Sequence, residues 1–315
     1  YNAAFTGDLR AVVHRITGRL ESPVAQVDAR YTTQPLFLVG NSLGANLITK
    51  YLGEEGLAGT THPCIAGGIS LGNPLSIDSR NVHTPWAQIL GLGVRKSFFH
   101  HRHQFRQFNC PTFQKAYRSL LTKSRIGDID ETAAPFMIRN DPQFPFSVSI
   151  GYDGCDDYCR DGSSYRYVSN VSVPLLKINS RDDDLVAPAA MNKLSYCLRN
   201  PNVIVVKTGT GGHLGWHAVD SYGSFPGKNW ADAATVDFIE AVIQTSGWST
   251  KTVDHGNAAH TVDVGTNEEN ETSSSSNMPT TSIGSDNADS SNEDQDYQKM
   301  VTKARQAAAR LRSRL

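Results

Sequence analysis

The sequence lacks any uninterrupted apolar run of the length needed to cross a bilayer, although 39% of its 315 residues are hydrophobic. A membrane-spanning helix needs about 20 such residues, so we expect a soluble chain. It also lacks an excess of charge, since its formal net charge is -1. Nucleic-acid-binding proteins usually carry a basic excess that replaces phosphate counterions. We therefore expect no nucleic-acid partner.

Cysteine is scarce and odd in number: Cys64, Cys110, Cys155, Cys159 and Cys197. Such a scattered set argues against a disulfide framework and favours a reducing, intracellular compartment. Cys155 and Cys159 are the one close pair. Because no second pair lies near them, we interpret them as ordinary thiols and not as zinc ligands.

The chain begins at Tyr1 and not at methionine, with a helix already under way. Thr6 precedes Gly7, Asp8 and apolar residues at helical spacing (Leu9, Val12, Val13 and Ile16), which predicts a helix capped by Thr6. We expect sequence upstream of Tyr1 to be missing, and no targeting segment can be read.

Up to about Gln244, short apolar runs alternate with helical stretches, the pattern of a mostly parallel sheet flanked by helices. The chain is thus expected to be an α/β protein. Strands buried on both faces are predicted at Leu36–Val39, Ile65–Leu71, Leu175–Asn179 and Val203–Lys207. Helices are predicted at Leu43–Glu55, with Gly56 as C-terminal cap, and at Pro188–Arg199 and Trp230–Gln244.

The alternation stops over residues 81–173, which we interpret as a non-sheet cap inserted into a domain of residues 1–248. It is rich in aromatic residues, among them Trp86, Phe98, Phe99, Phe105, Phe108, Phe113, Tyr117, Phe136, Phe144, Phe146 and Tyr152. Each is more simply explained by packing than by ligand contact. As a group, however, an insertion between two strands is where substrate-covering elements usually lie.

The last part of the chain changes composition. Residues 249–296 are acidic and serine-rich, which predicts a disordered linker. Residues 297–315 carry six basic residues with small apolar ones at helical spacing, which predicts a basic C-terminal helix. A solvated tail helix is favoured over attachment to an anionic membrane, because its apolar face is mostly alanine.

The strongest motif is Gly40-Asn41-Ser42-Leu43-Gly44, which joins a predicted strand directly to a predicted helix. A nucleophilic serine needs this tight turn, where flanking glycines allow close backbone approach. The helix amino terminus then offers N–H groups to a developing oxyanion. We predict Ser42 as a nucleophile and the Leu43 N–H as an oxyanion donor.

A serine hydroxyl also needs a base and an orienting acid, which should follow it in the order acid, then histidine. Asp182, Asp183 and Asp184 follow one predicted strand, and His213 follows the next in a glycine-rich turn. We choose Asp183 as the acid, with Asp182 as the alternative, and expect a neighbouring aspartate to cap the next helix or to stay solvated. The cluster at His100, His101 and His103 is interpreted as a solvated face of the cap.

With these motifs the chain resembles the YheT-like (AB hydrolase 4) family of α/β-hydrolases over residues 1 to about 248. The matching blocks are Thr6–Arg10, Leu36–Asn46, Lys50–Glu54, Asp156–Tyr158 with Ser163 and Ser164, Pro174–Asn179 with Asp182 and Asp183, and Gly211–Gly215. The resemblance implies an α/β-hydrolase fold whose nucleophile, acid and base are Ser42, Asp183 and His213. It also implies that early strands and a second oxyanion donor lie upstream of Tyr1, which would leave an exposed sheet edge.

Three positions depart from the family pattern: Asp184 replaces a usual proline, Ala45 a glycine and Cys159 a tyrosine. The expected activity is hydrolysis of a short-chain or lipid-type carboxylic ester through an acyl-enzyme, without metal or organic cofactor. Acyl transfer on the same triad and a non-catalytic, truncated scaffold are the alternatives. Membrane association through an upstream segment or the basic C-terminal helix also fits this family.

Overall fold

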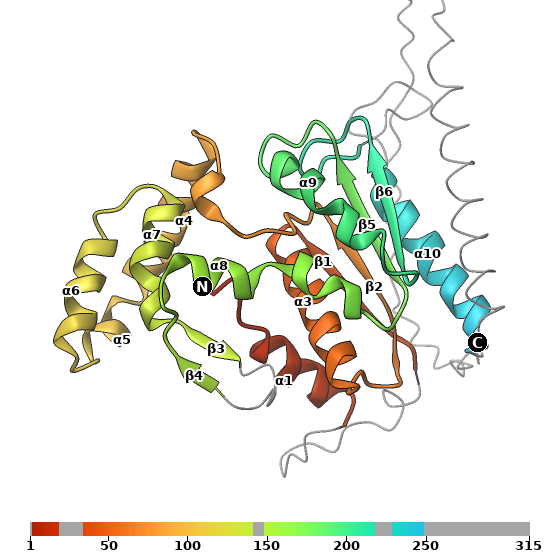
Figure 1. Cartoon of the computed structure of the whole chain (residues 1–315), viewed down its shortest axis with the longest axis horizontal. Helices are drawn as coiled ribbons and strands as arrows, with labels where there is room; N and C mark the ends of the chain where they lie inside the picture. The colour runs from red at the N-terminus through yellow and green to blue at the C-terminus, as the bar shows by residue number, and fades with distance from the viewer. Residues whose placement is uncertain (1, 19–33, 141–147, 218–228, 249–315) are drawn as a thin grey trace, which may run out of the picture. The chain divides into compact units, whose positions relative to one another are not determined.

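A computed structural model describes residues 2–18, 34–140, 148–217 and 229–248. Its main sheet has four parallel strands in the order β1-β2-β5-β6 (Figure 1). These are β1 (Leu36–Asn41), β2 (Ile65–Leu71), β5 (Leu175–Ser180) and β6 (Val203–Thr208). The four predicted strands and the parallel α/β class are therefore confirmed.

The two central strands differ from the two at the edges. Every residue of β2 and of β5 is buried, as expected for strands covered on both faces. In β1, by contrast, Val39 is 52% exposed, and β6 is buried only at Val203. Burial on both faces was thus correctly predicted for the centre of the sheet and wrong for its edges.

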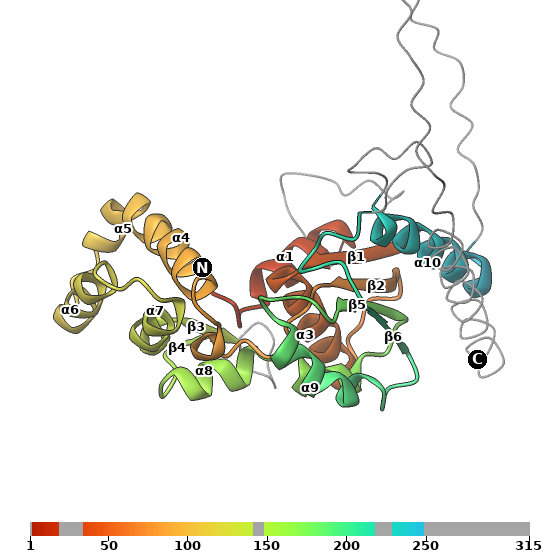
Figure 2. The ribbon, with the colours of Figure 1, turned by 90° about the horizontal axis from the view of Figure 1, so that it is seen from above.

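Helices cover both faces of the sheet (Figure 2). On one face, α1 (Gly7–Ile16), α3 (Leu43–Ala58) and α9 (Ala187–Cys197) contribute to a cluster that contains Leu52 and Leu175. On the other, α10 (Trp230–Ser246) packs Phe238 and Val242 against apolar residues of β2 and β5. The sheet therefore sits between two apolar layers, which hold its strand ends in fixed positions.

Two predicted helix caps differ from the structure. Thr6 is the N-cap residue of α1, as predicted, but its side chain makes no capping hydrogen bond, and its hydroxyl donates to Glu54 at 2.5 Å. Helix α3 continues to Ala58 and ends at Gly59, which has a left-handed φ of 66°. Gly56 lies inside the helix, where a Cβ would be 1.8 Å from the carbonyl oxygen of Asn170. Close packing, and not capping, therefore requires glycine at position 56.

The insertion between β2 and β5 is mostly helical, but it contains a short two-stranded sheet, so the prediction of a cap without sheet was wrong. It comprises α4 (Trp86–His100), α5 (Arg102–Arg106), α6 (Pro111–Leu120), α7 (Ile126–Ala133) and α8 (Cys155–Gly162), with short 3₁₀ turns at Ser79–Asn81, Ala134–Phe136, Ser164–Arg166 and Val168–Asn170. Strands β3 (Ile138–Asn140) and β4 (Val148–Ile150) form an antiparallel pair. We keep the name cap for this insertion.

Most of the cap aromatics contact one another, as the packing interpretation predicts. Ring contacts with centroids 5.3 to 6.2 Å apart link Phe98, Phe105, Phe108, Phe113, Tyr117 and Phe136. Phe144 and Phe146 lie outside the described residues. The predicted linker (249–296) and basic helix (297–315) also lie outside them.

None of the five cysteines forms a disulfide bond. Cys155 and Cys159 lie one turn apart on α8, with their sulfur atoms 3.4 Å from each other. Within the described ranges, no three histidine, cysteine or acidic side chains gather in a way that would hold a metal ion.

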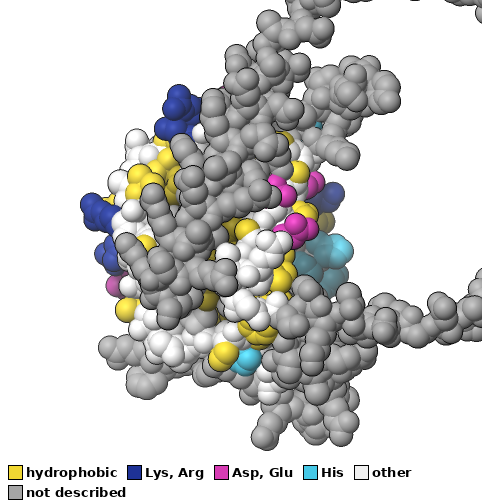
Figure 3. Space-filling view, turned by 90° about the vertical axis from the view of Figure 1, so that its right-hand side faces the viewer, with side chains coloured by type: hydrophobic (Ala, Val, Ile, Leu, Met, Phe, Trp, Pro, Cys, Tyr) yellow, Lys and Arg dark blue, Asp and Glu magenta, His cyan; other side chains and the backbone are white. Residues whose placement is uncertain are grey.

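The described helices include none that is both long and apolar enough to cross a bilayer. Figure 3 views the molecule from the right-hand side of Figure 1, where basic and acidic side chains both lie among apolar ones.

One buried charge interrupts the apolar character of the sheet. Lys177 of β5 is 1% exposed, and its ammonium group contacts the side-chain oxygen of Asn179 and the carbonyl oxygen of Asn73. Burial lowers the pKa of Lys177 from 10.5 to about 8. The folded protein therefore releases this proton at a lower pH than the unfolded chain does.

This difference predicts a pH-dependent stability. Below about pH 8 both states hold the proton, and the folded state bears the full cost of the buried charge; between about pH 8 and pH 10.5 that cost is relieved. Relative to Lys177→Met, the wild type should gain about 3 kcal/mol of unfolding free energy across this window. Urea titrations of both proteins from about pH 7 to pH 10.5 measure it. A difference that stays constant with pH would contradict the prediction.

Candidate active site

Ser42 lies on the turn between β1 and α3, in a backbone conformation that is rare for a residue with a side chain. Its φ is 53° and its ψ is -119°. The turn is tight because Gly40 lies against Gly44: a Cβ at Gly40 would be 2.4 Å from the Gly44 carbonyl oxygen. At Gly44 itself a Cβ would meet open space. Of the two glycines predicted to allow close approach, only Gly40 does so.

His213 lies between the predicted nucleophile and the predicted acid. Its Nε2 is 2.7 Å from Ser42 Oγ, and its Nδ1 is 2.8 Å from Asp183 Oδ2. An ionised carboxylate can only accept a hydrogen bond, so Nδ1 donates to it and Nε2 accepts from the serine hydroxyl. The structure thus brings all three predicted side chains into one hydrogen-bonded chain.

Asp183 is fixed through both of its oxygens. Its side chain is fully buried, and Oδ1 accepts hydrogen bonds from the N–H groups of Leu185 and Val186 at 2.9 and 3.0 Å, just before α9. The carboxylate that contacts His213 thus also anchors the chain that enters α9. Of the two outcomes expected for a neighbouring aspartate, capping of the next helix or exposure to solvent, Asp184 shows the second: it is exposed, and α9 has no side-chain cap.

Asp182, the alternative acid, has a different position. Its carboxylate accepts a hydrogen bond from Ser180 Oγ and another, at 2.8 Å, from the Gly212 N–H. The hydrogen bond from Ser180, followed by those from backbone N–H groups, lowers the pKa of Asp182. Asp182 therefore stays ionised and ties the loop that carries His213 to the end of β5.

Two glycines shape this loop, and neither was predicted as a site residue. Gly72 follows β2 with a φ of 59°, and a Cβ there would be 2.7 Å from the His213 carbonyl oxygen. Gly211 has a φ of 133°, and a Cβ there would be 2.3 Å from the ring of Trp216. The Trp216 indole N–H in turn donates to Thr208 at 3.0 Å. The sequence signal for Gly211 was its place in a glycine-rich turn, whereas Gly72 gave none.

A buried polar layer lies beneath the turn, and it too was missed. The Asn73 amide donates to Ser70 Oγ, Thr49 Oγ1 and the Ala45 carbonyl at 3.0 to 3.2 Å. Asn46 bridges α3 and the cap, since its amide donates to the Gly162 carbonyl at 2.7 Å and its oxygen accepts from the Ser164 N–H at 3.0 Å. These contacts fix the first turn of α3 against β2 and the cap.

Leu43, the predicted oxyanion donor, is the first residue of α3. An N–H in the first turn of a helix has no acceptor within that helix and lies at the positive end of its dipole. The Leu43 side chain packs against the apolar core of the cap, as do Val94 and Phe98 of α4. The neighbour of Ser42 therefore contacts the cap directly.

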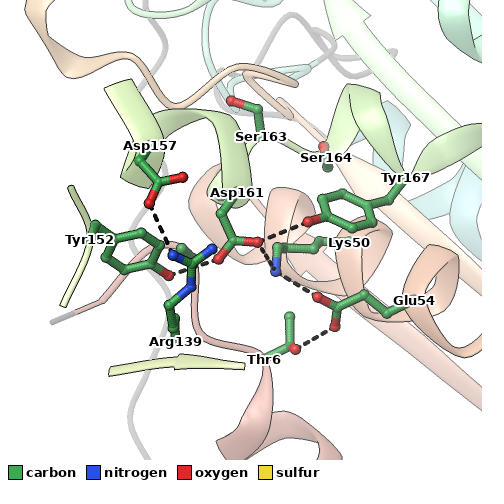
Figure 4. A network of polar contacts seen from close by, with 12 residues as sticks. Thr6, Lys50, Glu54, Arg139, Tyr152, Asp157, Asp161, Ser163, Ser164 and Tyr167 are labelled. Carbon is green, nitrogen blue, oxygen red and sulfur yellow. Dashed lines mark hydrogen bonds and ion pairs between the residues drawn. The ribbon is translucent and has the colours of Figure 1, made fainter. Parts of the chain in front are cut away.

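An ion-pair network joins α3 to the cap and to α1 (Figure 4). Lys50, which is fully buried, pairs with Glu54 at 2.5 Å and with Asp161 of α8 at 3.2 Å. The hydroxyls of Tyr152 and Tyr167 donate to the two oxygens of Asp161 at 2.7 and 2.8 Å. Burial, followed by the charge of Asp161, raises the pKa of both tyrosines, so both stay neutral donors.

The same network includes residues of α1. Arg10, 2% exposed, donates to Glu54 at 2.9 Å and to Glu55 at 2.8 Å. The buried face of α1 thus carries Arg10 and His14 beside Val13, whereas Val12 and Ile16 are exposed. The amphipathic pattern predicted for this helix was correct for Val13 and wrong for those two residues.

The remaining histidine cluster takes no part in this site. His100, His101 and His103 are exposed at the end of α4 and in α5, which agrees with the solvated face predicted for them.

Comparison with known proteins gives abhydrolase-domain relatives. The chain is 30% identical over 254 residues to an embryogenesis-associated protein EMB8 of Picea glauca, covering 77% of this chain and 48% of that protein. It is 28% identical over 235 residues to a phospholipase ABHD3 of Bos taurus, covering 72% and 51%. It is 24% identical over 224 residues to a monoacylglycerol lipase of Saccharomyces cerevisiae, covering 69% and 43%. The chain thus spans about half the length of these relatives.

No protein-family model matches the chain. Among solved structures, a monoacylglycerol lipase of Paleococcus ferrophilus overlaps 77% of this chain and 77% of its own, with a TM-score of 0.35 and 12% identity. This overlap is partial, and the fold assignment rests on the strand order and the strand–turn–helix unit described above.

The turn at Ser42 gives a prediction with a matched control. Gly40→Ala should cost about 3 kcal/mol of unfolding free energy, because the new methyl group meets backbone atoms that cannot move aside. Gly44→Ala should be neutral or stabilise by up to about 1 kcal/mol, since alanine suits a helix better and meets no neighbour there. Chemical denaturation of both variants measures the difference. Equal effects of the two substitutions would contradict this account of the turn.

The ion-pair network at Asp161 gives a second prediction with a matched control. Asp161→Asn should cost about 3 kcal/mol, because Lys50 would lose the charge of a buried partner. Asp156 lies on the same helix, but its side chain is 86% exposed in its pair with Arg80. Asp156→Asn should therefore cost about 0.5 kcal/mol or less. Thermal and urea unfolding measure both, and a cost for Asp161→Asn as small as that of the control would show the network to be unimportant.

Proposed function

Because the chain belongs to the abhydrolase-domain family of α/β-hydrolases, we propose that it is a serine hydrolase that cleaves carboxylic esters. The observation that carries this proposal is the continuous hydrogen-bonded chain from Ser42 through His213 to Asp183. The names of the relatives, phospholipase and monoacylglycerol lipase, support an ester of a lipid or a shorter acyl chain as substrate.

In the proposed reaction, Ser42 Oγ attacks the carbonyl carbon of the ester while His213 Nε2 takes the hydroxyl proton. The carbonyl oxygen becomes an oxyanion, and the imidazole becomes a cation that the buried carboxylate of Asp183 stabilises. When the tetrahedral intermediate collapses, the bond to the leaving oxygen breaks, and His213 returns the proton to the departing alcohol. The acyl group then remains on Ser42 as an ester.

In the second half of the reaction, water takes the place of the alcohol and the acyl-enzyme is hydrolysed. Water gives a proton to His213 and attacks the acyl carbon, and the collapse of the new intermediate releases the carboxylic acid and restores the Ser42 hydroxyl. The proposed oxyanion donor is the N–H of Leu43, supported by the positive end of the α3 dipole. No step in this sequence needs a metal ion or an organic cofactor.

The same acyl-enzyme also permits transfer to an alcohol in place of water. The geometry of Ser42 and His213 does not distinguish water from an alcohol as acyl acceptor, so the two reactions are separated by measuring their products. Incubation with an ester in the presence of a second alcohol, followed by quantification of free acid and new ester, separates hydrolysis from acyl transfer.

Labelling with a serine-directed fluorophosphonate tests the proposal. Wild-type protein should become covalently modified at Ser42, and Ser42→Ala should not react, because no hydroxyl remains for His213 to activate. Asp183→Asn should slow turnover of a chromogenic ester by about 10⁴-fold, since an amide would hold the wrong imidazole tautomer. Asp182→Asn is the matched control and should cost tenfold at most.

Two outcomes would contradict the assignment. Undiminished labelling of Ser42→Ala would place the nucleophile elsewhere. A folded wild type that neither reacts with the probe nor turns over any ester would instead favour the non-catalytic scaffold.

A further inference from the structure

The cap contains a long segment without any acidic residue. Between Trp86 and Arg125 there is no aspartate or glutamate, but there are eight basic residues: Arg95, Lys96, Arg102, Arg106, Lys115, Arg118, Lys123 and Arg125. Because the formal net charge of the whole chain is -1, the rest of the chain is net acidic. The charge of the protein is therefore strongly divided between this segment, which we call the basic cap segment, and the remainder.

This positive charge is not neutralised within the part of the chain that the structure describes. Ion pairs there involve none of the eight basic residues. Three of the guanidinium groups donate to neutral oxygens instead: Arg95 to the Lys123 carbonyl at 3.3 Å, Arg102 to the Phe99 carbonyl at 3.4 Å and Arg125 to Thr84 at 3.2 Å. The field of the basic cap segment thus acts on solvent and on anything that approaches it.

Helix α4, at the start of this segment, carries apolar side chains on its solvent-exposed side as well as on its buried side. One face is buried: Ala87 is 1% exposed, and a Cβ at Gly91 would be 2.2 Å from the Ser124 carbonyl oxygen. Val94 and Phe98 continue this face onto the cap core. The opposite face is therefore the one left open to solvent.

That opposite face exposes large apolar side chains beside basic ones. Trp86, Ile89 and Leu90 are 38%, 52% and 39% exposed. Trp86 and Ile89 are three residues apart and share a side of the helix, and Lys96, seven residues after Ile89, continues that side two turns further on. Leu90, next to Ile89 in the chain, lies between this side and the buried face. Leu92, Phe99 and, after α5, Phe108 are also exposed, by 45%, 56% and 58%.

We propose that α4 and the basic residues around it dock the protein onto an anionic lipid surface. A helix that lies in a membrane interface combines exposed tryptophan, phenylalanine and leucine with lysine and arginine, as this one does. Each basic residue near an anionic leaflet adds to the attraction, and the buried apolar side chains hold the helix in place. Large apolar side chains gathered and exposed on a protein surface mark interaction sites.

Two other occupants fit the surface less well. A second copy of this chain that pairs the same surface face to face would bring two basic cap segments together, and their like charges would repel. A nucleic acid would match the charge, and Trp86, Phe99 and Phe108 offer planes on which bases stack. It would leave the aliphatic side chains of Ile89 and Leu90 uncovered, however. A lipid surface matches the charge and the aliphatic residues together.

The position of α4 links docking to the candidate active site without depending on its chemistry. Val94 and Phe98 on its buried face pack against the same apolar core as Leu43, the residue next to Ser42. A docked helix would therefore lie one packing layer from the residue that follows Ser42. The docking itself is independent of catalysis, so Ser42→Ala should bind vesicles as the wild type does.

Vesicle binding tests the proposal. Purified protein should co-sediment with vesicles that mix phosphatidylserine and phosphatidylcholine, and bind vesicles of phosphatidylcholine alone at least tenfold more weakly. Lys96→Gln combined with Arg106→Gln should weaken binding to the anionic vesicles about 30-fold, since each basic residue near such a surface contributes about a fivefold factor. Ile89→Ser combined with Leu90→Ser should weaken it at least tenfold by removing the inserted side chains.

Matched control variants carry the same kinds of substitution, apolar to serine and basic to glutamine, on elements outside the cap. Leu57→Ser and Val236→Ser alter residues of α3 and α10 that are 62% and 53% exposed, and Arg199→Gln with Lys207→Gln alters two exposed charges outside the cap. These variants should bind as the wild type does, and circular dichroism should show all variants folded.

Several results would overturn the proposal. One is the absence of binding to either vesicle; another is binding that survives the Ile89 and Leu90 substitutions, which would reveal charge attraction alone. Loss of wild-type self-association on the same substitutions, measured by sedimentation, would show that a second copy covers this face. Tighter binding to single-stranded RNA than to vesicles would identify a nucleic-acid surface instead.

Discussion

The candidate site depends on the parallel alignment of four strands, because it brings the ends of all four to one edge of the sheet. Ser42 follows β1, Gly72 follows β2, Asp183 follows β5 and the loop with His213 follows β6. Since β1 and β6 are separated by two strands, His213 must cross the ends of both to reach Ser42. Glycine at position 72 leaves room for this crossing. Any shift in strand order or register would separate the three side chains.

A second requirement is that α3 holds the turn at Ser42 in place. Its outer end is fixed by Lys50 and Glu54, which connect it to the cap and to α1, and its first turn is fixed by Asn46 and the Asn73 amide. The cap therefore does more than cover the sheet edge. Because the same core contacts Leu43 and α4, the surface that we propose to meet lipid and the turn that carries Ser42 share one packed unit.

Much of the fold and of the candidate site was predictable from the sequence. Apolar runs gave the four strands, and the direct passage from strand to helix identified Ser42. Asp183 and Asp182 were harder to separate, because adjacent residues at a strand end point in different directions that only the fold defines. Local rules failed where tertiary contacts prevail: the Thr6 hydroxyl bonds Glu54 in place of its own helix, and Lys177 lies inside a strand that reads as apolar.

The central claim is that Asp183, His213 and Ser42 form one continuous hydrogen-bonded chain, and proton NMR of protein labelled with ¹⁵N in its histidines tests it most directly. A proton held between Nδ1 and a buried carboxylate should resonate far downfield of the amide region and correlate with the His213 ring nitrogen. This signal is expected in the wild type and should be lost in Asp183→Asn. The absence of such a downfield proton from the folded wild type would contradict it.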